Sequence, residues 1–249
     1  MTDKSNDSWP SGGFDPLLSE LQTQYFPDLE NQDFGGLLCD RRLGNISIVS
    51  SFGTESAALI HFVNKYRSDI PIIFIDTHKH FRETIDYRDR LMDYFKFNLI
   101  VVSPDAQDLA QEDPDGDLNK YDQNACCTIR KTFPLQDAIS EFDAWISGRK
   151  RYQGGSRSAI PILERDGEKI KINPLAMWSA KDIAEYFHRH GLPRHPLEVQ
   201  GYLSIGCAPC TRAVKKGEDA RSGRWANNPE KSECGIHLGP DGRFRRIRR

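Results

Sequence analysis

The chain has 249 residues, of which 38% are hydrophobic and 28% charged, and its formal net charge is −2. This composition is typical of a soluble globular protein with one sizeable domain or two small ones. No apolar run approaches the roughly 20 residues that a membrane span requires, and the N-terminus has neither a basic region nor an apolar stretch. The sequence therefore predicts a cytoplasmic protein without a membrane partner.

The first half of the chain has the pattern of an α/β fold. A polar stretch, residues 1–13, is expected to be disordered, and a helical pattern follows over 15–25. Strands are then predicted at residues 45–52, 71–76, 98–103 and 142–147, and helices at 55–67 and 81–95. Short apolar strands that alternate with amphipathic helices favour βαβ units and a doubly wound, mainly parallel sheet.

Ligands bind such sheets at the edge where the carboxyl ends of the parallel strands lie. That edge is expected to carry residues 50–56, 76–80 and 103–105. We expect residues 14–217 to form one domain and residues 218–249 to form a C-terminal segment.

Later elements are less regular. Residues 104–124 are polar and are predicted to form a loop. A helix is expected to begin near Cys126 and to break at Pro134, because proline removes a backbone donor. Ser179 has the pattern of an N-cap for a helix that ends near Gly191.

Charge is distributed unevenly along the chain. Residues 1–40 contain eight acidic side chains and one basic, whereas residues 206–249 contain eleven basic and five acidic. The basic end either serves solubility or receives an anion. Aromatic residues are not interleaved with the basic ones, so a small anion suits the sequence better than nucleic acid.

One strand-to-helix turn and two basic stretches could hold that anion. The turn Ser50–Ser56 has small residues that let the backbone approach an anion, although it is neither a Walker loop nor a GxGxxG turn, and an ordinary capped turn would look similar. Residues 148–157 combine four cations with three glycines, and Arg221 and Arg224 lie three positions apart. Guanidinium groups pair bidentately with oxyanions, but each stretch could also be a solvated surface.

Five of the six cysteines are candidates for chemistry. Cys39 lies in an apolar stretch and is predicted to be an ordinary buried thiol. Cys126-Cys127 and Cys207-Ala-Pro-Cys210 supply four thiols whose spacing favours an iron–sulfur cluster, with a zinc site or a redox dithiol as alternatives. Cations that follow the first pair would stabilise a negatively charged cluster.

Cys234 has no cysteine partner at metal spacing. The nearby His237 and an arginine-rich approach could lower its pKa and make it a nucleophile, although a lone cysteine near a terminus is usually inert.

Taken together, these motifs resemble those of the assimilatory sulfonucleotide reductase family. The resemblance runs from about Asn45 to Leu238 and is carried by Cys-Cys-Thr-Ile-Arg-Lys131, Gly-Cys-Ala-Pro-Cys-Thr-Arg212 and Glu-Cys-Gly-Ile-His237. It implies an adenine nucleotide alpha hydrolase-like fold with a mobile C-terminal segment. It also implies a [4Fe–4S] cluster on the four paired cysteines, and Cys234 as the catalytic nucleophile.

The resemblance also implies a set of substrate-binding residues. They are Ser51, Phe52, Gly53, Thr54, Glu55, Ser56, Thr77, Lys131, Arg149, Lys150, Arg151, Arg221, Arg224 and His237. One departure is His78, which stands where the family commonly has the glycine of Asp-Thr-Gly.

The expected reaction is reduction of adenylyl sulfate to sulfite and AMP through an S-sulfocysteine, in assimilatory sulfate reduction and cysteine biosynthesis. Thioredoxin or a glutaredoxin-like dithiol would be the reductant, and a homo-oligomer is allowed. The cluster cysteines favour adenylyl sulfate, whereas the turn Ser50–Ser56, the phosphate loop of this family, is closer to that of reductases of phosphoadenylyl sulfate. The substrate could therefore be adenylyl sulfate, phosphoadenylyl sulfate or both. An ATP pyrophosphatase and a non-enzymatic iron–sulfur protein are the alternatives outside this family.

Overall fold

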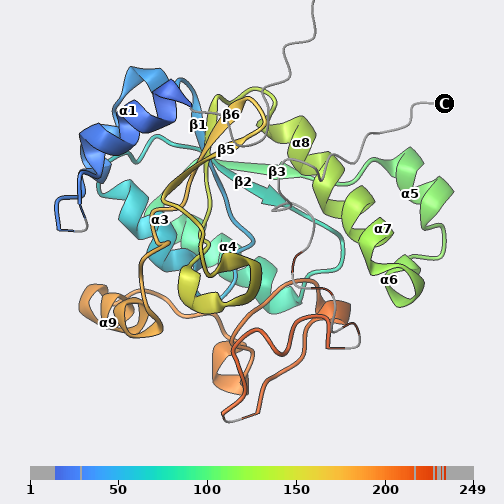
Figure 1. Cartoon of the computed structure of the whole chain (residues 1–249). Coiled ribbons are helices and arrows are strands. Elements are labelled where there is room, and N and C mark those ends of the chain that lie inside the picture. The colour runs from blue at the N-terminus through green and yellow to red at the C-terminus, as the bar shows by residue number, and fades with distance from the viewer. Residues whose placement is uncertain are drawn as a thin grey trace, which may run out of the picture.

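The structure is a computed structural model that describes residues 15–28, 30–215, 217–226, 228, 231 and 233. Within them, six strands form one sheet in the order β3-β2-β1-β4-β6-β5 (Figure 1). The strands are β1 Ile46–Val49, β2 Ile72–Ile75, β3 Leu99–Val102, β4 Ala144–Ile146, β5 Leu163–Asp166 and β6 Lys169–Ile172. All neighbouring pairs are parallel except β5 with β6. The predicted α/β fold with a mainly parallel sheet is confirmed.

Strand β1 lies at the point where the strand order reverses. It pairs in parallel with β2 on one side, through Ile48 and Ile72, and with β4 on the other, through Ile48 and Ile146. The connections that leave these two central strands run in opposite directions, which opens a crevice at their carboxyl ends. The geometry of the sheet therefore places a ligand site beyond Val49 and Ile146.

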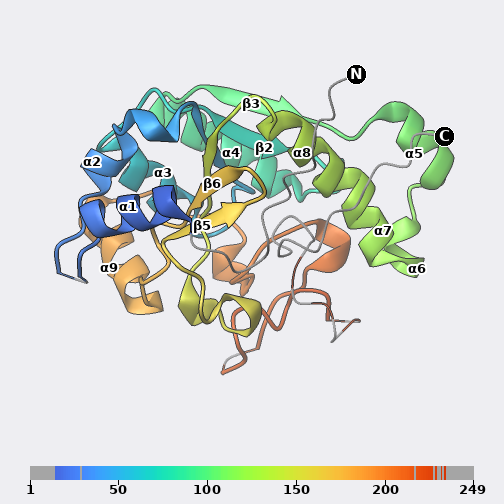
Figure 2. The same ribbon diagram turned by 45° about the horizontal axis from the view of Figure 1, so that its top comes forward.

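Helices cover both faces of the sheet (Figures 1 and 2). The helices are α1 Pro16–Tyr25, α2 Phe34–Leu38, α3 Ser56–Asn64, α4 Arg82–Phe95, α5 Ala106–Glu112, α6 Leu118–Tyr121, α7 Gln123–Cys127, α8 Phe133–Ile139 and α9 Ala180–His190. Alternate residues of β2 enter different cores, as expected for a strand buried on both sides. Ile72 and Phe74 join the larger core with α1–α4 and α9, whereas Ile73 and Ile75 join Leu135 of α8.

Helix α9 confirms a prediction in detail. The Ser179 hydroxyl accepts a hydrogen bond from the Asp182 backbone N–H at 3.2 Å, and the Asp182 carboxylate accepts one from the Ser179 N–H at 2.7 Å. Gly191 ends the helix with φ +57°. The capping box and the glycine therefore define both ends of the helix.

Two predictions about residues 104–139 were wrong. The stretch predicted as a loop contains α5 and α6. Neither helix has a buried residue, so their sequences lack the apolar periodicity by which a helix is recognised. The helix also does not break at Pro134. The α-helix gives way earlier, to a π-helical turn at Thr128–Thr132, and Pro134 lies in the first turn of the next helix, α8. Backbone N–H groups in the first turn of a helix have no acceptor within the helix, so a proline there loses no hydrogen bond.

Cys39 is exposed rather than buried. It forms the C-cap of the short helix α2, whose Leu37 and Leu38 fill the core. The apolar run therefore ends one residue before the thiol.

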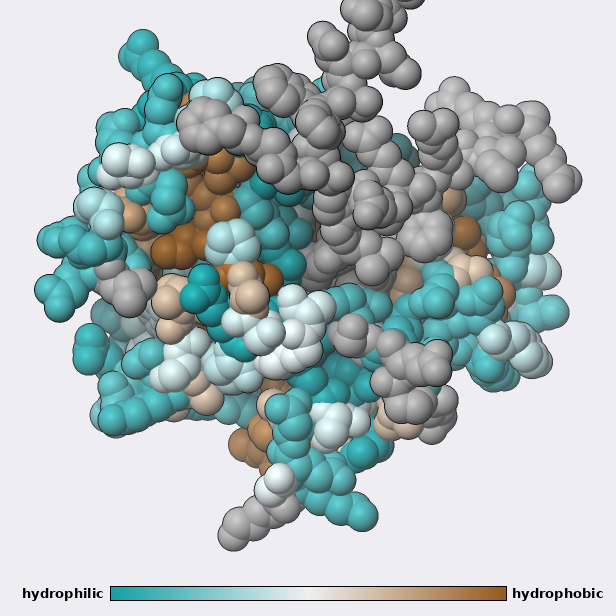
Figure 3. Space-filling view, viewed as in Figure 1, coloured by the Kyte–Doolittle hydropathy of each residue, from teal (hydrophilic) through white to brown (hydrophobic). Residues whose placement is uncertain are grey.

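The described part of residues 191–226 extends from the sheet as a long segment, orange to red in Figure 1, that lies along the ligand edge. A backbone bridge between His80 and Cys207 attaches the segment to the chain that follows β2, and a second bridge, between Thr211 and Arg224, lies within the segment. Most of the described surface on this face is hydrophilic (Figure 3). No helix among the described residues is long and apolar enough to cross a membrane. The predicted disorder of residues 1–13 and mobility of the C-terminal segment fall on residues outside the described ones, apart from a few of the segment.

Candidate active site

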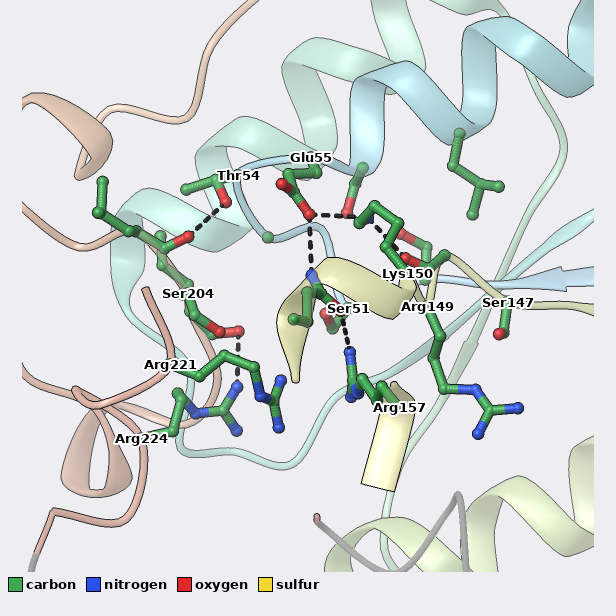
Figure 4. Close-up of a pocket in the computed structure, with 18 of the residues that line it drawn as sticks. Ser51, Thr54, Glu55, Ser147, Arg149, Lys150, Arg157, Ser204, Arg221 and Arg224 are labelled. Carbon is green, nitrogen blue, oxygen red and sulfur yellow. Dashed lines mark hydrogen bonds and ion pairs between the residues drawn. The ribbon is translucent and has the colours of Figure 1, made fainter. Parts of the chain in front are cut away.

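A cleft opens where the sheet topology predicts it, and we call it the switch-point cleft. Its free volume is about 790 Å³, open solvent at its mouth included. It is lined by Val49, Ser50, Ser51, Gly53, Thr54, Glu55, Ser56, Leu59, Ser147, Gly148, Arg149, Lys150, Gln153, Arg157, Leu203, Ser204, Ile205, Arg221 and Arg224 (Figure 4). These residues come from the ends of β1 and β4, the loops that follow them, and the C-terminal part of the chain.

The turn between β1 and α3 forms one wall of the cleft. Its conformation depends on Phe52, which has φ +49° and whose fully buried ring packs against Phe74 and Phe97. The Thr54 hydroxyl donates to the Leu203 carbonyl at 2.9 Å, which joins the turn to the C-terminal part of the chain. The buried ring thus holds the turn in place, while Ser51, Gly53 and Thr54 face the cleft.

Glu55 connects this turn to the basic loop after β4. Its carboxylate pairs with the Lys150 ammonium at 2.7 Å and accepts hydrogen bonds from Gln153 at 3.0 Å and from the Tyr152 hydroxyl. Lys150 is only 2% exposed. Burial lowers the pKa of Lys150, and Glu55 opposes that shift by stabilising the ammonium. Lys150 is therefore matched by a carboxylate rather than left as a free positive charge.

Arginines form the opposite wall. Figure 4 shows the guanidinium groups of Arg157, Arg221 and Arg224 on one side of the cleft, whereas that of Arg149 turns away. Arg149 pairs with Glu164, and burial lowers its pKa to about 10. The Arg224 Nε atom is buried and has no hydrogen-bond partner among the residues that the structure describes. An unsatisfied buried donor beside two further guanidinium groups is a strong electrostatic match for an oxyanion.

A second cavity, which we call the thiol cavity, lies beside the cleft. It is lined by Cys126 and Cys127 at the end of α7, by Cys207 and Cys210 at the two ends of a 3₁₀ turn, and by other residues that include Lys131. Its free volume is about 320 Å³, open solvent included. The Cys207 thiol lies 3.3 Å from the Thr77 hydroxyl. The structure therefore brings together four thiols that are far apart in the sequence.

The four thiols do not share one electrostatic environment. Burial raises the pKa of Cys126 to about 12 and also raises that of Cys210. Burial acts in the same direction on Cys207, but the Lys131 ammonium and the Thr77 hydroxyl outweigh it and lower its pKa. Among the described residues, no group of three or more His, Cys, Asp or Glu is arranged to hold a single metal ion.

Trp225 separates the two spaces. Its ring packs with Cys127 and Cys210 on the side of the thiol cavity. The Arg224 guanidinium lies 4.4 Å from the ring centroid and that of Arg221 lies 5.8 Å away. The indole thus touches the thiols and two arginines of the cleft at the same time, at favourable distances for cation–π contacts.

Comparison with known proteins decides the family. A family model described as the phosphoadenosine phosphosulfate reductase domain matches residues 45–213. The chain belongs to this family. The matched residues include the cleft turn, the basic loop and all four thiols of the cavity.

Relatives of this reductase carry a consistent name. Proteins named adenosine 5'-phosphosulfate reductase are 50% identical to it in Mesorhizobium japonicum, over 78% of this chain and 76% of the relative, and 43% identical in Bacillus subtilis, over 75% and 82%. Among solved structures, the phosphoadenylyl-sulfate reductase of Candida auris is similar, with a TM-score of 0.65 and 23% identity over 82% of this chain and all of that one. At this identity the structural likeness shows the fold.

Most of the expected substrate-binding residues of the reductase meet at the cleft. Those that line it are Ser51, Gly53, Thr54, Glu55, Ser56, Arg149, Lys150, Arg221 and Arg224. Thr77 and Lys131 lie at Cys207 instead. The side chains of Phe52 and Arg151 lie elsewhere, because Phe52 is in the core and Arg151 donates to the Ile160 carbonyl at 2.8 Å. Cys234 and His237 lie outside the described residues.

The structure adds residues that the sequence did not single out. Arg157 ends the basic loop that was recognised, but only the first three cations of that loop were nominated. Trp225 was passed over because a single aromatic residue carries no pattern.

His78 adopts φ +58°, a left-handed conformation that favours glycine, which explains why glycine is common at this position in the family.

Proposed function

We propose that this chain reduces adenylyl sulfate to sulfite and AMP, with Cys234 as the nucleophile. The observation that carries the proposal is the pairing of two neighbouring sites. A cleft with three convergent guanidinium groups at the topological switch point lies beside a cavity lined by four thiols. The names of the relatives favour adenylyl sulfate over its 3′-phosphorylated form.

The cleft suits the substrate in both parts. Val49 at the end of β1, Leu59 of α3 and Gly148 after β4 line it, and a flat adenine ring would find apolar contacts there. Arg221 and Arg224 would hold the phosphosulfate and stabilise the charge that develops on AMP as it leaves. The phosphate loop would contribute backbone N–H groups at the start of α3.

The residues of the thiol cavity fit an iron–sulfur cluster. Four cysteine thiolates are the donor set of a [4Fe–4S] centre, and Cys126, Cys127, Cys207 and Cys210 would supply them. When bound, such a centre would add a structural cross-link and a local charge between α7 and the C-terminal part of the chain. Lys131 next to Cys207 would balance negative charge there. Zinc on the same thiols is the alternative.

The chemistry of the chain's own residues has two steps. The Cys234 thiolate attacks the sulfate sulfur, a sulfur–sulfur bond forms, and the sulfur–oxygen bond to AMP breaks with its electron pair leaving on AMP. A thiolate of an external dithiol then attacks the Cys234 sulfur, and sulfite leaves with the electron pair of the sulfur–sulfur bond. The second thiol of the dithiol closes its disulfide and restores Cys234. We propose thioredoxin or a glutaredoxin-like protein as the dithiol, and the cytoplasm, where thiols stay reduced, as the location.

Radiolabelled substrate tests the reaction. Purified protein incubated with adenylyl [³⁵S]sulfate in the absence of a dithiol should carry one label, which thioredoxin releases as sulfite. Cys234→Ser should carry no label, while Cys39→Ser, a control at an exposed cysteine, should be labelled normally. Absence of label in the wild type with its metal content intact would contradict the proposal. Equal labelling by the 3′-phosphorylated nucleotide would show dual specificity.

Metal analysis tests the cluster. Protein purified anaerobically should contain iron and acid-labile sulfide in equal amounts, and Cys210→Ser should lose most of both. Zinc without sulfide in the wild type would assign the four thiols to a zinc site instead.

A further inference from the structure

One acidic side chain occupies the cationic wall of the switch-point cleft. The Glu233 carboxylate accepts hydrogen bonds from Arg157 at both oxygens, 2.5 Å from Nε and 2.8 Å from Nη2. The Ser156 hydroxyl donates to it at 3.4 Å, and Arg221 Nη2 lies 3.7 Å away. The side chain of Glu233 is 6% exposed and that of Arg157 is 11% exposed. This is a buried, two-pronged ion pair, which fixes orientation as well as position.

The surroundings keep this carboxylate charged. Burial acts to raise the pKa of Glu233, but hydrogen bonds from Arg157 and the charges of Arg221 and Arg149 outweigh it, so the pKa is lowered. Exposed ion pairs contribute little because water screens them, whereas breaking a buried pair leaves a charge without compensation. Glu233 is therefore held in place much more firmly than a surface glutamate would be.

A second side chain of the same segment is anchored near Trp225. The Lys231 ammonium donates to the Asn124 side-chain oxygen and lies 5.8 Å from the centroid of the Trp225 ring. Asn124 belongs to α7, the helix that ends with two thiols of the cavity. The two contacts therefore attach Lys231 to α7 and Glu233 to Arg157, which lines the cleft.

We propose that Glu233 is a positioning residue: its ion pair with Arg157 restrains the chain at residue 233 and thereby limits the motion of the neighbouring nucleophile, Cys234. The inference rests on the proposed function, since it takes Cys234 as the attacking thiol. Consecutive Cα atoms are about 3.8 Å apart, so an anchor at Glu233 limits how far the next residue can lie from Arg157. Holding a nucleophile near its target replaces a search through space by a short local motion.

The cleft keeps capacity for an anion while Glu233 is in place. Arg224 Nε has no hydrogen-bond partner, and Arg224 makes no ion pair within 4.0 Å among the described residues. The one hydrogen bond that its side chain makes to the described residues, from Nη1 to the Ile205 carbonyl, is long at 3.3 Å. A bound sulfate group can therefore use Arg224 without displacing the carboxylate. The opposite view, in which Glu233 merely competes with the substrate for Arg157, predicts the reverse effect on affinity and is an outcome of the test below.

The test separates attack from binding. The rate of label transfer to the protein in a single turnover of adenylyl [³⁵S]sulfate is measured for Glu233→Gln and Glu233→Asp, and the Kd for the same nucleotide is measured for each in a Cys234→Ser background. Glu233→Gln should slow label transfer at least about tenfold while its Kd changes by less than about threefold. Glu233→Asp, which keeps the charge on a shorter side chain, should recover part of the rate. The matched control is Glu218→Gln, which removes a carboxylate that pairs with Arg212 at 3.2 Å away from the cleft.

Two results would overturn the inference. An unchanged transfer rate in Glu233→Gln would show that the anchor does not place the thiol, and a Kd that tightens more than about threefold would show that Glu233 is a competitor. Hydrogen exchange distinguishes a failure of the proposed function from a failure of the Glu233 anchor. If the wild type forms no adduct, the proposed function fails. The anchor is then judged by backbone amides of residues 226–233, which should exchange faster in Glu233→Gln than in Glu218→Gln, and equal exchange would refute it.

Discussion

His195 shows how a single buried residue can link stability to pH. It is 1% exposed, its Nδ1 accepts from the Leu197 backbone N–H at 3.2 Å, and its Nε2 lies 3.1 Å from the Thr84 hydroxyl. Both ring nitrogens are thus satisfied by the neutral tautomer that carries its proton on Nε2. Burial lowers the pKa of His195 from 6.5 to about 4, and Arg90 adds to the shift.

We therefore expect the free energy of unfolding to fall between pH 6.5 and pH 4. The unfolded chain binds a proton in this range that the folded chain excludes, so stability is full above 6.5 and is lost as the pH falls towards 4. The loss from this group is about 3 kcal/mol at most, since one pKa unit corresponds to about 1.4 kcal/mol. Urea unfolding of the wild type and of His195→Gln at several pH values measures it. If the two pH profiles run parallel, His195 is not the source.

Residue identities could be predicted where chemistry is tied to a type and a spacing. The four thiols were recognised in this way, and the structure places them around one cavity. Arg157, Trp225 and Glu233 could not be recognised, because each matters through a partner that is remote in sequence. The contact between Arg157 and Glu233, for example, joins residues 76 positions apart.

At the scale of elements, the π-helical turn between α7 and α8 depends on one buried ion pair. Arg130 in this turn donates to the Asp113 carboxylate at 2.6 Å and 3.0 Å and to the Thr77 carbonyl at 3.0 Å. Only 7% of the Arg130 side chain and 1% of the Asp113 side chain are exposed. The pair fastens the irregular segment that holds α5 and α6 to the end of β2.

Arg130→Met should destabilise the protein by about 3–5 kcal/mol, because it leaves Asp113 buried without its partner. The exposed pair of Arg82 and Asp86, four residues apart on α4, is the control. Arg82→Met should cost no more than about 0.5 kcal/mol. The midpoint of chemical denaturation, followed by circular dichroism, distinguishes the two. A small loss in Arg130→Met would mean that the pair is dispensable.

The strands and long helices could be predicted because their buried faces appear in the sequence as apolar runs or as apolar residues at regular spacing. Strand β2 is fully buried and reads as a continuous apolar run, and α9 has a cap at each end. Helices α5 and α6 bury none of their residues, so their sequences resemble loops. Helix α5 has a local cap, because the Asp105 carboxylate accepts from the backbone of Gln107 at 2.8 Å. At the start of α6, the Leu118 backbone N–H donates instead to the Asp113 carboxylate at 2.8 Å.

At the scale of the whole molecule, the thiol cavity brings α7 next to the segment that follows α9. Cys127 ends α7, whereas Cys207 lies beyond α9, in the segment bridged to His80. A cluster on these thiols would cross-link the sheet domain to the segment that carries the arginines Arg221 and Arg224. The sequence predicted that these four cysteines act together, and the structure places all four around one cavity. The sheet topology explains the position of the neighbouring cleft.

Removal of the proposed cluster should therefore affect the cleft as well as the thiols. Iron chelation under reducing conditions should lower the melting temperature and weaken the binding of AMP, because the segment that carries the cleft arginines loses its cross-link. Calorimetry on the holoprotein and the chelated protein measures both. Unchanged AMP binding after complete loss of iron would show that the two sites are independent.

The position of Trp225 gives the protein an optical reporter. Its indole touches two thiols of the cavity on one side and the guanidinium groups of the cleft on the other. Its fluorescence should be quenched by a metal cluster that absorbs at its emission wavelength, and should shift when an anion draws Arg224 away from the ring. The difference between the spectra of the wild type and Trp225→Phe isolates this signal from that of the other tryptophans. One indole can thus follow both the assembly of the thiol site and the arrival of a ligand in real time.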